Sequence, residues 1–467
     1  NATYTLPKKV TYSSSTGLIT LSEYSTSYTQ AYINGYRTNR GSVNLSNNYR
    51  PTETYVTTNT SQGFANNPSQ DFSKNDRTSG VAAYYYVFDT TQQGCTSSTT
   101  NQLEDDNCYR KVSVSSSEQQ NFANWYSFYR TRALATQSAA NLAFLSLPEN
   151  VRVTWQMLNS CYLAGNGTCS GGSGTTYSNP LRNFSGTHRQ QFFDWLADTR
   201  GSGSTPLKAA TQRVGTFLTT TGQNSPWAYN PGVASTPAYS CRPSYHILMT
   251  DGVWNETTNL GIGNVDGTNR TLPDGTTYTA QTPFRDGANR NYGSTLADLA
   301  FKYWAEDANS SLSNDQKPFI PYANANANTQ YWDPRNDPAT WQHLITFTLG
   351  LGLTRSLTSP QWGGDTYSGD YSRLISGEIE WPEPGSNQSQ NVYELWHAAL
   401  NSRGEFFSVD SPEDMVSAFK TILSRIANRE TSASAVSLES AVTSSGNEAY
   451  YARFSSDNWS GELIKYD

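Results

Sequence analysis

The sequence predicts an α/β protein in which helices cover both faces of an open, doubly wound, mostly parallel sheet. The first observation is that segments with strand-like patterns alternate with segments of helical spacing between residues 118 and 430. The second is that polar inserts interrupt this alternation, as expected of loops that grow from the ends of a sheet. The inserts lie at residues 161–186, 222–243, 255–292, 309–340 and 355–390.

The predicted core begins with a long amphipathic helix at residues 118–147, which Pro148 ends. Residues 151–158 then alternate apolar and polar side chains, which predicts a strand. A short helix is predicted at 188–198. The next helix is predicted at 205–218, with Thr205 as its N-cap and Pro206 at its first position.

A strand is predicted at residues 244–252, and it ends in Asp251 and Gly252. The elements that follow are a helix at 293–307, a strand at 341–353, a helix at 391–402, a strand at 405–410 and a helix at 411–430. Ser411, Pro412 and Asp414 open the last helix in the pattern of a capping box.

Two regions flank this core and have a different character. Residues 1–117 are rich in loops and contain short strand-like pieces at 17–21, 81–89 and 111–115. Residues 431–467 indicate a linker and then the first strands of a second β domain that is cut off. Three regions are therefore predicted, with boundaries at residues 117 and 430.

Composition excludes several classes of protein. Charged residues make up only 15% of the 467 residues, and the net charge is −7, so no basic field exists to attract nucleic acid. No apolar run approaches the ~20 residues that a membrane-spanning helix needs. Asn1 is not preceded by a secretion signal, and we expect that such a signal has been removed or left out. The polar, tyrosine-rich composition favours an exported protein.

Cysteine spacing supports the same compartment. Cys95 and Cys108 lie close together in a polar loop, as do Cys161 and Cys169, which predicts two local disulfides in an oxidising environment. Metal binding is the competing interpretation, although neither pair has C-x-x-C spacing or a nearby histidine. Cys241 is left over, and we expect a free, buried thiol.

The predicted sheet points to a candidate site, because ligands of open α/β sheets bind beyond the carboxyl ends of the strands. Thr205 follows the glycine-rich segment 201–204, and Asp251 follows a predicted strand. A hydroxyl and a carboxylate suit a hard cation such as Mg²⁺ or Ca²⁺. The alternatives are a helix N-cap for Thr205 and a turn residue for Asp251.

These blocks resemble a known fold and a known family. The order long helix, strand, GSGSTPLKAA and ILMTDG resembles a von Willebrand factor A domain, in which a metal-ion-dependent adhesion site takes a Thr and an Asp at the positions of Thr205 and Asp251. The chain also resembles type IV pilus tip proteins of the PilY/PilC/ComC family, from LPKKV at residue 6 to the last residue. The blocks that carry this resemblance are FANWYSFYRTRALATQSAANLAF, FFDWLADTRGSGSTPLKAA, YHILMTDGVWN, ELWHAALNSRGEFFSVDSPEDMVSAF and ARFSSDNWSGELIKY.

The resemblance implies a secreted adhesin and pilus-biogenesis factor at the pilus tip or outer membrane of a Gram-negative bacterium. Its implied partners are minor pilins, a host-cell or abiotic surface, and a C-terminal β-propeller of the same protein. The adhesion site also needs Asp-x-Ser-x-Ser, and the nearest spelling is Glu23 to Ser27, whose Glu is one methylene too long. We expect the true element upstream of this chain, and hence weak or absent metal binding here.

Other constellations favour packing over catalysis. His246 lies in a predicted strand and His397 on an apolar helix face, and His188 and His343 complete the histidines. No G-x-S-x-G elbow is present. Acidic pairs such as 104–106 and 413–414 suit solvated faces or caps, and Asp266 and Asp274 suit loop turns. The sequence therefore does not predict an enzyme.

Aromatic residues indicate a core and a hypothetical surface. Trp125, Tyr126, Phe128 and Tyr129 have helical spacing and are predicted to be core residues. Aromatic residues in the inserts are interpreted as exposed and able to bind sugars or surfaces, namely Trp227, Trp254 and Trp332.

The predicted function is therefore adhesion and surface-contact sensing at a pilus tip, as in virulence-associated surface proteins. Two alternatives stay open. The first is a structural scaffold for pilus assembly without an external ligand. The second is a secreted enzyme acting on polysaccharide, which would need a carboxylate pair in one cleft.

Overall fold

The computed structural model describes residues 2–49, 81–96, 102, 105–161, 167–200, 204–250, 254, 259–288, 290, 292–385, 390–433, 449–455 and 460–466. Contacts divide the chain into two units. Unit 1 comprises Asn1–Leu142 with Leu196–Arg200, and unit 2 comprises Ala143–Trp195 with Gly201–Asp467. The domain boundaries predicted at residues 117 and 430 stay predictions.

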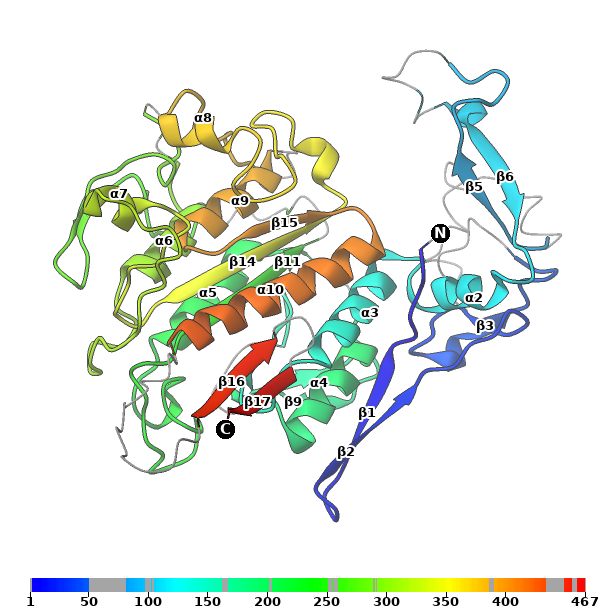
Figure 1. Ribbon diagram of the computed structural model, residues 1–467, viewed down its shortest axis with the longest axis horizontal. Helices are drawn as coiled ribbons and strands as arrows, with labels where there is room; N and C mark the ends of the chain where they lie inside the picture. Colours follow the sequence, from blue (N-terminus) through cyan, green and yellow to red (C-terminus); the bar gives the residue numbers. More distant parts are fainter. Residues whose placement is uncertain are drawn as a thin grey trace. The chain divides into compact units, whose positions relative to one another are not determined.

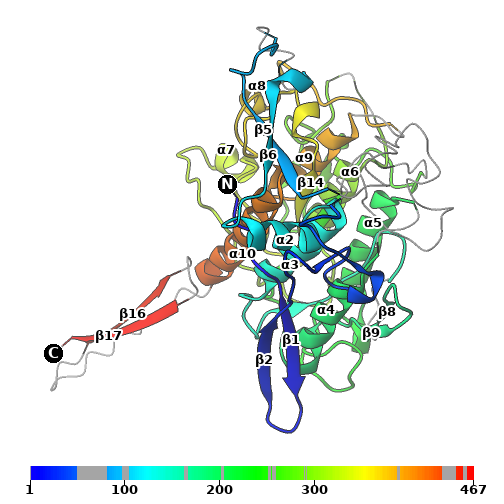
Figure 2. The same ribbon diagram turned by 90° about the vertical axis from the view of Figure 1, so that its right-hand side faces the viewer.

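Unit 1 contains short antiparallel strand pairs. They are β1 (Lys8–Ser13) with β2 (Leu18–Glu23), β3 (Ala31–Tyr32) with β4 (Ser42–Val43), and β5 (Tyr84–Phe88) with β6 (Tyr109–Ser113). The 3₁₀ turns η1 (Thr38–Arg40) and η5 (Asp106–Cys108) accompany them. The predicted strand-like pieces at 17–21, 81–89 and 111–115 overlap β2, β5 and β6, which confirms them. Figure 2 shows the β1–β2 and β5–β6 pairs as separate ribbons.

The single long helix predicted at residues 118–147 is wrong, because two helices occupy that segment. They are α2 (Gln119–Phe128) and α3 (Arg132–Phe144). The chain leaves helical geometry at Tyr129, and the Ser138 hydroxyl donates a 2.7 Å hydrogen bond to the carbonyl of Phe128. The hydroxyl of Thr131 accepts from the N–H of Leu134 at 3.2 Å, as an N-cap does. Side chains thus supply the backbone partners that the break removes.

Unit 2 is organised around a parallel sheet, the central feature that the sequence predicts. Its strands are β11 (Ser244–Thr250), β14 (Leu344–Leu351) and β15 (Phe406–Val409). The order is β11-β14-β15, and both pairings are parallel. Every residue of β14 is buried, whereas most of β11 is only half-buried. In the part of the chain that the structure describes, β11 pairs with β14 alone.

Helices cover the sheet through the connections between its strands. The helix α6 (Leu296–Ala305) lies in the crossover from β11 to β14, and α9 (Asn391–Asn401) in the crossover from β14 to β15. Both contact β14 and pack on each other, while α5 (Leu207–Leu218) packs on α6. The last helix, α10 (Pro412–Ala433), contacts β15. Figure 1 shows α10 in front of the strands and α9 behind them.

One predicted sheet strand is wrong. Residues 151–158 contribute only β7 (Arg152–Val153), which pairs antiparallel with β10 (Arg182–Asn183) and not with the parallel sheet. Beyond β7, side chains and not a neighbouring strand supply hydrogen-bond donors for backbone carbonyls. The Thr154 hydroxyl donates to the carbonyl of Asn179 at 2.6 Å, and the Asn179 amide donates to the carbonyl of Trp155 at 2.6 Å. These bonds satisfy the chain without a ladder.

The other predicted helices and strands are confirmed with small shifts of their ends. The remaining elements are β8 (Thr168–Ser170), β9 (Thr176–Ser178), α4 (Gly186–Asp198), η6 (Gly222–Asn224), β12 (Arg270–Thr271), β13 (Thr277–Tyr278), α7 (Ala327–Trp332), η7 (Thr354–Ser356) and α8 (Tyr371–Ser376). The hydroxyl of Ser411 accepts from the N–H of Asp414 at 3.1 Å, as its predicted capping role requires.

The core of unit 2 surrounds α9, whose eleven residues are all buried. One large cluster joins Leu248 of β11, Leu296 of α6, Trp396 of α9 and Phe406 of β15. A second cluster joins the insert residues Tyr278 and Phe284 with α6. The inserts therefore form part of the packed interior and are not mere surface decoration.

The passage from α9 to β15 is exceptionally tight. Arg403 has a positive φ of 64°, and the N–H of Gly404 donates to the carbonyl of Ala399 at 2.8 Å. A Cβ at Gly404 would lie 2.0 Å from the carbonyl oxygen of Thr346 in β14. Only glycine fits at this contact between backbone segments.

The C-terminal region contains β16 (Ala449–Ser455) and β17 (Ser460–Tyr466), which pair antiparallel and confirm that strands were correctly predicted there. Among the described residues the protein is thus mixed α/β with small sheets and no closed barrel. The likeness to a von Willebrand factor A domain stays a prediction. Within the described chain, no helix combines the length and apolar character needed to cross a membrane.

Candidate functional site at the carboxyl edge of the parallel sheet

The candidate site lies where the three parallel strands end. The register pairs Thr250 with Gly350 and Leu351 with Val409, so the carboxyl ends of β11, β14 and β15 share one edge. The described chain leaves this edge at Gly352 after β14 and at Asp410 after β15. An edge of this kind is the usual place for a ligand in an open α/β sheet.

Thr205 is half-buried and lies two residues before α5. The first helical hydrogen bond joins the N–H of Ala210 to the carbonyl of Pro206, so Pro206 and not Thr205 holds the N-cap position. The predicted cap at Thr205 with Pro206 as first helical residue is therefore one residue out. The helix begins later because the N–H of Leu207 donates to the carbonyl of Thr205 at 2.9 Å in a tighter turn.

Asp251 lies outside the described residues, so its position relative to Thr205 stays a prediction. The residues around the two candidates nevertheless enter one hydrophobic cluster. Leu207 follows Thr205 by two positions, while Leu248 and Trp254 flank Asp251 on either side, and all three are buried in the same cluster. Packing of this kind favours the predicted convergence of the two loops.

The weak match for the third adhesion-site element lies in unit 1, whereas the sheet lies in unit 2. Glu23 ends β2 and forms an ion pair with Lys8 of β1. The hydroxyl of Thr26 is hydrogen-bonded to that of Ser127 at 2.7 Å. These side chains have partners within their own unit, which accounts for them without a metal.

Polar groups that the sequence analysis did not single out also lie at this edge. The hydroxyls of Thr354 and Ser408 are hydrogen-bonded at 2.8 Å. The N–H of Thr354 donates to the Asp410 carboxylate at 3.4 Å, and Asp410 is exposed directly after β15. A signal existed in the sequence, because SVD at 408–410 repeats the pattern of an acid after a strand seen in MTD at 249–251.

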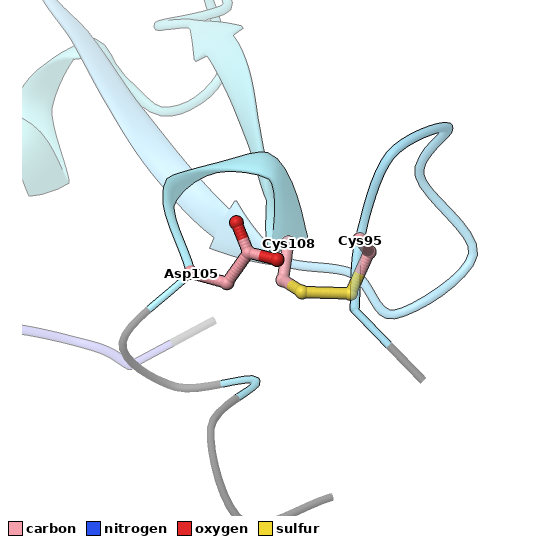
Figure 3. A group of neighbouring side chains, drawn as sticks. All are labelled: Cys95, Asp105 and Cys108. Carbon is pink, nitrogen blue, oxygen red and sulfur yellow. A yellow bond between two sulfur atoms is a disulfide. The ribbon is translucent and has the colours of Figure 1, made fainter. Parts of the chain in front are cut away.

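The two predicted disulfides are present, Cys95–Cys108 and Cys161–Cys169. Figure 3 shows the first of them beside Asp105. Asp105 accepts hydrogen bonds from the N–H groups of Asn107 and Thr96, which lower the pKa of its carboxyl. Sulfur atoms joined to each other cannot act as thiolate ligands, so this trio is a structural group and not a metal site.

Cys241 is free, as predicted, but it is exposed and not buried. It precedes β11 by three residues. The prediction of burial was wrong because the buried part of the chain begins only within the strand, which is itself half-buried over its first four residues.

The histidines are packed or paired. Nε2 of His188 is 2.8 Å from the carbonyl of Val153, and Nε2 of His343 is 3.1 Å from Asp337. His397 stacks on Trp381 with ring centroids 4.5 Å apart. Burial lowers the pKa of His246 to about 4, and its Nδ1 has no hydrogen-bond partner in the described structure.

The predicted surface aromatics are a clear error. Trp227, Trp254 and Trp332 are 1%, 3% and 9% exposed. The indole of Trp227 donates to the carbonyl of Leu218 at 3.1 Å, and Trp332 packs against Tyr278 and Phe284. Tryptophan in an insert is not thereby exposed, because these inserts carry their own clusters. The predicted burial of Tyr126, Phe128 and Tyr129 is confirmed, with Trp125 partly buried against them.

Asp266 and Asp274, which were both predicted as turn residues, have different environments in the structure. Asp274 is exposed and accepts from the N–H of Thr276 at 2.9 Å, as a turn residue does. Asp266 also lies in a turn, which the N–H of Thr268 closes on the carbonyl of Val265 at 3.4 Å, but unlike Asp274 it is fully buried. Its carboxylate accepts from the amide of Asn401 at 2.8 Å, on a helix far along the chain.

Comparison with known proteins gives one consistent result. The chain is 50% identical to type IV pilus biogenesis factor PilY1 of Pseudomonas aeruginosa strain PAK and 49% identical to that of strain PAO1, over 100% of its length in both cases. It is 44% identical to PilY1 of strain UCBPP-PA14 over 99% of its length. The chain spans 38% of the length of each of these relatives. No family model matches the chain, and no solved structure matches it either.

Proposed function

The chain belongs to the PilY family of type IV pilus biogenesis factors, and from this premise we propose that it forms the contact-making region of a pilus-tip adhesin. The proposal extends to its location, as a secreted protein at the cell surface, at the pilus tip or outer membrane. Its proposed partners are minor pilins at the tip and a host-cell or abiotic surface. A β-propeller in the rest of the protein is part of the same proposal.

The observation that carries the proposal is the shared edge of β11, β14 and β15. Asp410 follows β15 at this edge, Asp251 follows β11 in the sequence, and Thr205 precedes α5, which packs on α6. Hydroxyl and carboxylate oxygens are ligands for Mg²⁺ or Ca²⁺. In a von Willebrand factor A-type site, a cation held there would bind an acidic group of the target.

Residues Thr205 and Asp251 supply only part of a coordination shell, so weak cation binding is expected. Calorimetry with Mg²⁺, Mn²⁺ and Ca²⁺ tests the site in the protein and in Asp251→Ala. Asp315→Ala, an exposed acid elsewhere in unit 2, is the matched control. Loss of the weak signal in Asp251→Ala alone supports the site. A strong signal that survives this substitution would refute it.

The insert at residues 222–243 offers a surface for contact. Tyr229, Val233 and Tyr239 are exposed by 40%, 45% and 38%. The guanidinium of Arg242 lies 4.1 Å from the ring of Tyr239 and 5.7 Å from that of Tyr229. A paired backbone at Ala228 and Ala238 holds this loop in shape. Exposed aromatic rings beside a cation are typical of recognition surfaces.

Substitution of these exposed residues separates adhesin from scaffold. Deleting the insert would also remove the buried Trp227, so point changes are the sharper test. We expect Tyr229→Ser with Tyr239→Ser to reduce attachment while pilus number stays normal. The control is Tyr322→Ser, an exposed tyrosine of another insert. Loss of pili with both sets of changes would favour the scaffold.

Surface-contact sensing requires that the chain respond to force. The parallel sheet, with β14 buried throughout, is expected to resist tension, whereas the inserts should yield first. Single-molecule pulling on the whole protein measures this. A trace without any extension event before global rupture would argue against sensing through this region.

A further inference from the structure

A second group of metal-ligand side chains lies buried in unit 2. One carboxylate oxygen of Asp266, one of Asp286 and a ring nitrogen of His397 all lie within 4.8 Å of one another. The three residues are 0%, 2% and 0% exposed. None of them belongs to the carboxyl edge of the sheet, because two come from the insert at 255–292 and one from α9.

The helix α9 forms one side of the group. Glu394, His397 and Asn401 recur at spacings of three and four residues, which places them on one face of the helix. Asp266 lies in the loop before β12, and Asp286 in the loop between β13 and α6. The group therefore joins the insert to the most deeply buried helix of the unit.

Two neighbouring carboxylates accept several backbone hydrogen bonds. Asp298 accepts from the N–H and hydroxyl of Thr295 and from the N–H groups of Val265 and Asp266. Glu394 accepts from the N–H groups of Leu296 and Ala297 at the start of α6. These partners and the positive end of the α6 dipole stabilise negative charge.

Asp266 and Asp286 are much less well satisfied. One oxygen of Asp266 accepts from the Asn401 amide, but the other has no hydrogen-bond partner in the described structure. Asp286 accepts from the N–H of Tyr292 at 3.1 Å. The amide oxygen of Asn401 and Nδ1 of His397, both buried, also have no hydrogen-bond partner there. Three buried atoms that could bind a metal thus lack a hydrogen-bond partner among the described residues.

The charge balance points in the same direction. Among the described residues, the ion pairs of Asp266 and Glu394 involve His397 only, at 3.8 Å and 3.7 Å. Burial raises the pKa of Asp266 well above its usual range, and neighbouring carboxylates add to the effect. Buried carboxylates of this kind need a proton or a cation.

We propose that a divalent transition-metal ion of the zinc or manganese class occupies this group, with Asp266, Asp286 and His397 as side-chain ligands. Two carboxylates neutralise a dication. Imidazole nitrogen favours a transition metal over Ca²⁺ or Mg²⁺, which take oxygen ligands. The Phe284 carbonyl lies 2.6 Å from Nε2 of His397, and the Asn401 amide lies against Asp266. Both can complete a closed, structural shell after a small rearrangement.

The test begins with the metal content of the whole protein, purified without added metal and measured by mass spectrometry. After chelation, ZnCl₂ or MnCl₂ is added and the melting temperature is recorded. We expect about one equivalent of metal and a rise of roughly 5 °C at saturating metal. Asp266→Asn, Asp286→Asn and His397→Gln should each abolish that rise. Glu149→Gln, an exposed acid of unit 2, should retain it.

Several results would overturn the proposal. Metal that persists in all three ligand variants would place it elsewhere, and a response to Ca²⁺ alone would exclude the transition-metal class. No metal and no rise in the wild type would show that protons and the His397 imidazolium suffice. If a variant does not fold, X-ray absorption of the zinc-loaded wild type decides. A shell of nitrogen and oxygen with one imidazole supports the site, and a sulfur ligand refutes it.

Discussion

Buried aspartates of unit 2 occupy two contrasting environments. Asp337 accepts hydrogen bonds from Nε2 of His343 and from the Trp304 indole, both at 3.1 Å. Burial alone would raise the pKa of Asp337, but His343 and the more distant Arg429 lower it to about 2. Asp286 is buried as well, and burial raises its pKa to about 7 despite the opposing charge of His397.

The difference shows that burial alone does not decide what a carboxylate does. Asp337 is a structural anion because donors and cations surround it. Asp266 and Asp286 share one histidine with Glu394 and keep unpartnered atoms nearby. The first environment is complete as it stands, whereas the second has capacity for a further positive charge.

Removal of the Asp337 carboxylate, which has hydrogen-bond partners, is the most sensitive test of this comparison. Asp337→Ala leaves His343 and the Trp304 indole without their partner in the interior. We expect a loss of about 3–5 kcal/mol in the free energy of unfolding, measured by urea denaturation. Asp315→Ala, an exposed acid, serves as control. A loss below ~1 kcal/mol would mean that this network is not the completed one.

A buried ring nitrogen, Nδ1 of His246, has no hydrogen-bond partner among the described residues and extends the comparison to histidine. The folded-state pKa of His246 is about 4, below the ~6.5 of an unfolded chain. The unfolded state therefore takes up a proton first as pH falls. Stability should be fully present above pH ~6.5 and should drop by up to ~3 kcal/mol toward pH ~4.

Denaturation midpoints of the wild type and His246→Gln across this pH range check the expectation. The variant should have a flatter pH profile than the wild type. Parallel profiles for the wild type and His246→Gln would contradict the assignment.

The carboxylate of Asp298, which belongs to the capping box of α6, tests a hydrogen-bonded acid at a helix end. Asp298→Ala removes the capping box of α6 and the acceptor for Val265 and Asp266. We expect about 2 kcal/mol of destabilisation, since one cap contributes ~1 kcal/mol and the loop contacts add to it. Calorimetric melting measures the change. Asp298→Asn keeps one acceptor oxygen, so its melting temperature should lie between those of the wild type and Asp298→Ala.

The smallest expected effect comes from a change at Asp266. In chelated protein, Asp266→Asn removes a carboxylate that has one oxygen without a hydrogen-bond partner in the described structure, and it keeps the shape of the side chain. We expect the free energy of unfolding to change by less than ~1 kcal/mol, or to rise slightly. Urea denaturation in the presence of a chelator measures it. A loss as large as that of Asp337→Ala would show that Asp266 is an ordinary structural anion.

Much of the fold follows from local sequence, because helix caps and apolar periodicity act over a few residues. The strands of the parallel sheet and helices such as α9 and α10 were predictable on that basis. The break between α2 and α3 was not, because it depends on the Ser138 hydroxyl reaching back to the Phe128 carbonyl. The isolated β7 likewise depends on Asn179, more than twenty residues away.

The candidate sites divide in the same way. The site at Thr205 and Asp251 rests on a local pattern, a hydroxyl and an acid beside predicted strand ends, and it stays a prediction. The Asp266 group could not be predicted, because Asp266-Gly267 and Asp274-Gly275 have the same local spelling. What separates these two acids is Asn401, which lies 135 positions from Asp266. The three insert tryptophans were misplaced for the same reason, since their burial depends on distant partners.

The complete burial of α9 has a consequence for how unit 2 assembles. Since no side of this helix faces water, its isolated segment cannot gain the solvation that lets an amphipathic helix persist alone. Its apolar surface is covered only when the sheet, α6 and the inserted loops have all closed around it. Unit 2 should therefore fold in one cooperative step, and shortened versions that lack any of these walls should collapse as a whole and not lose one layer at a time.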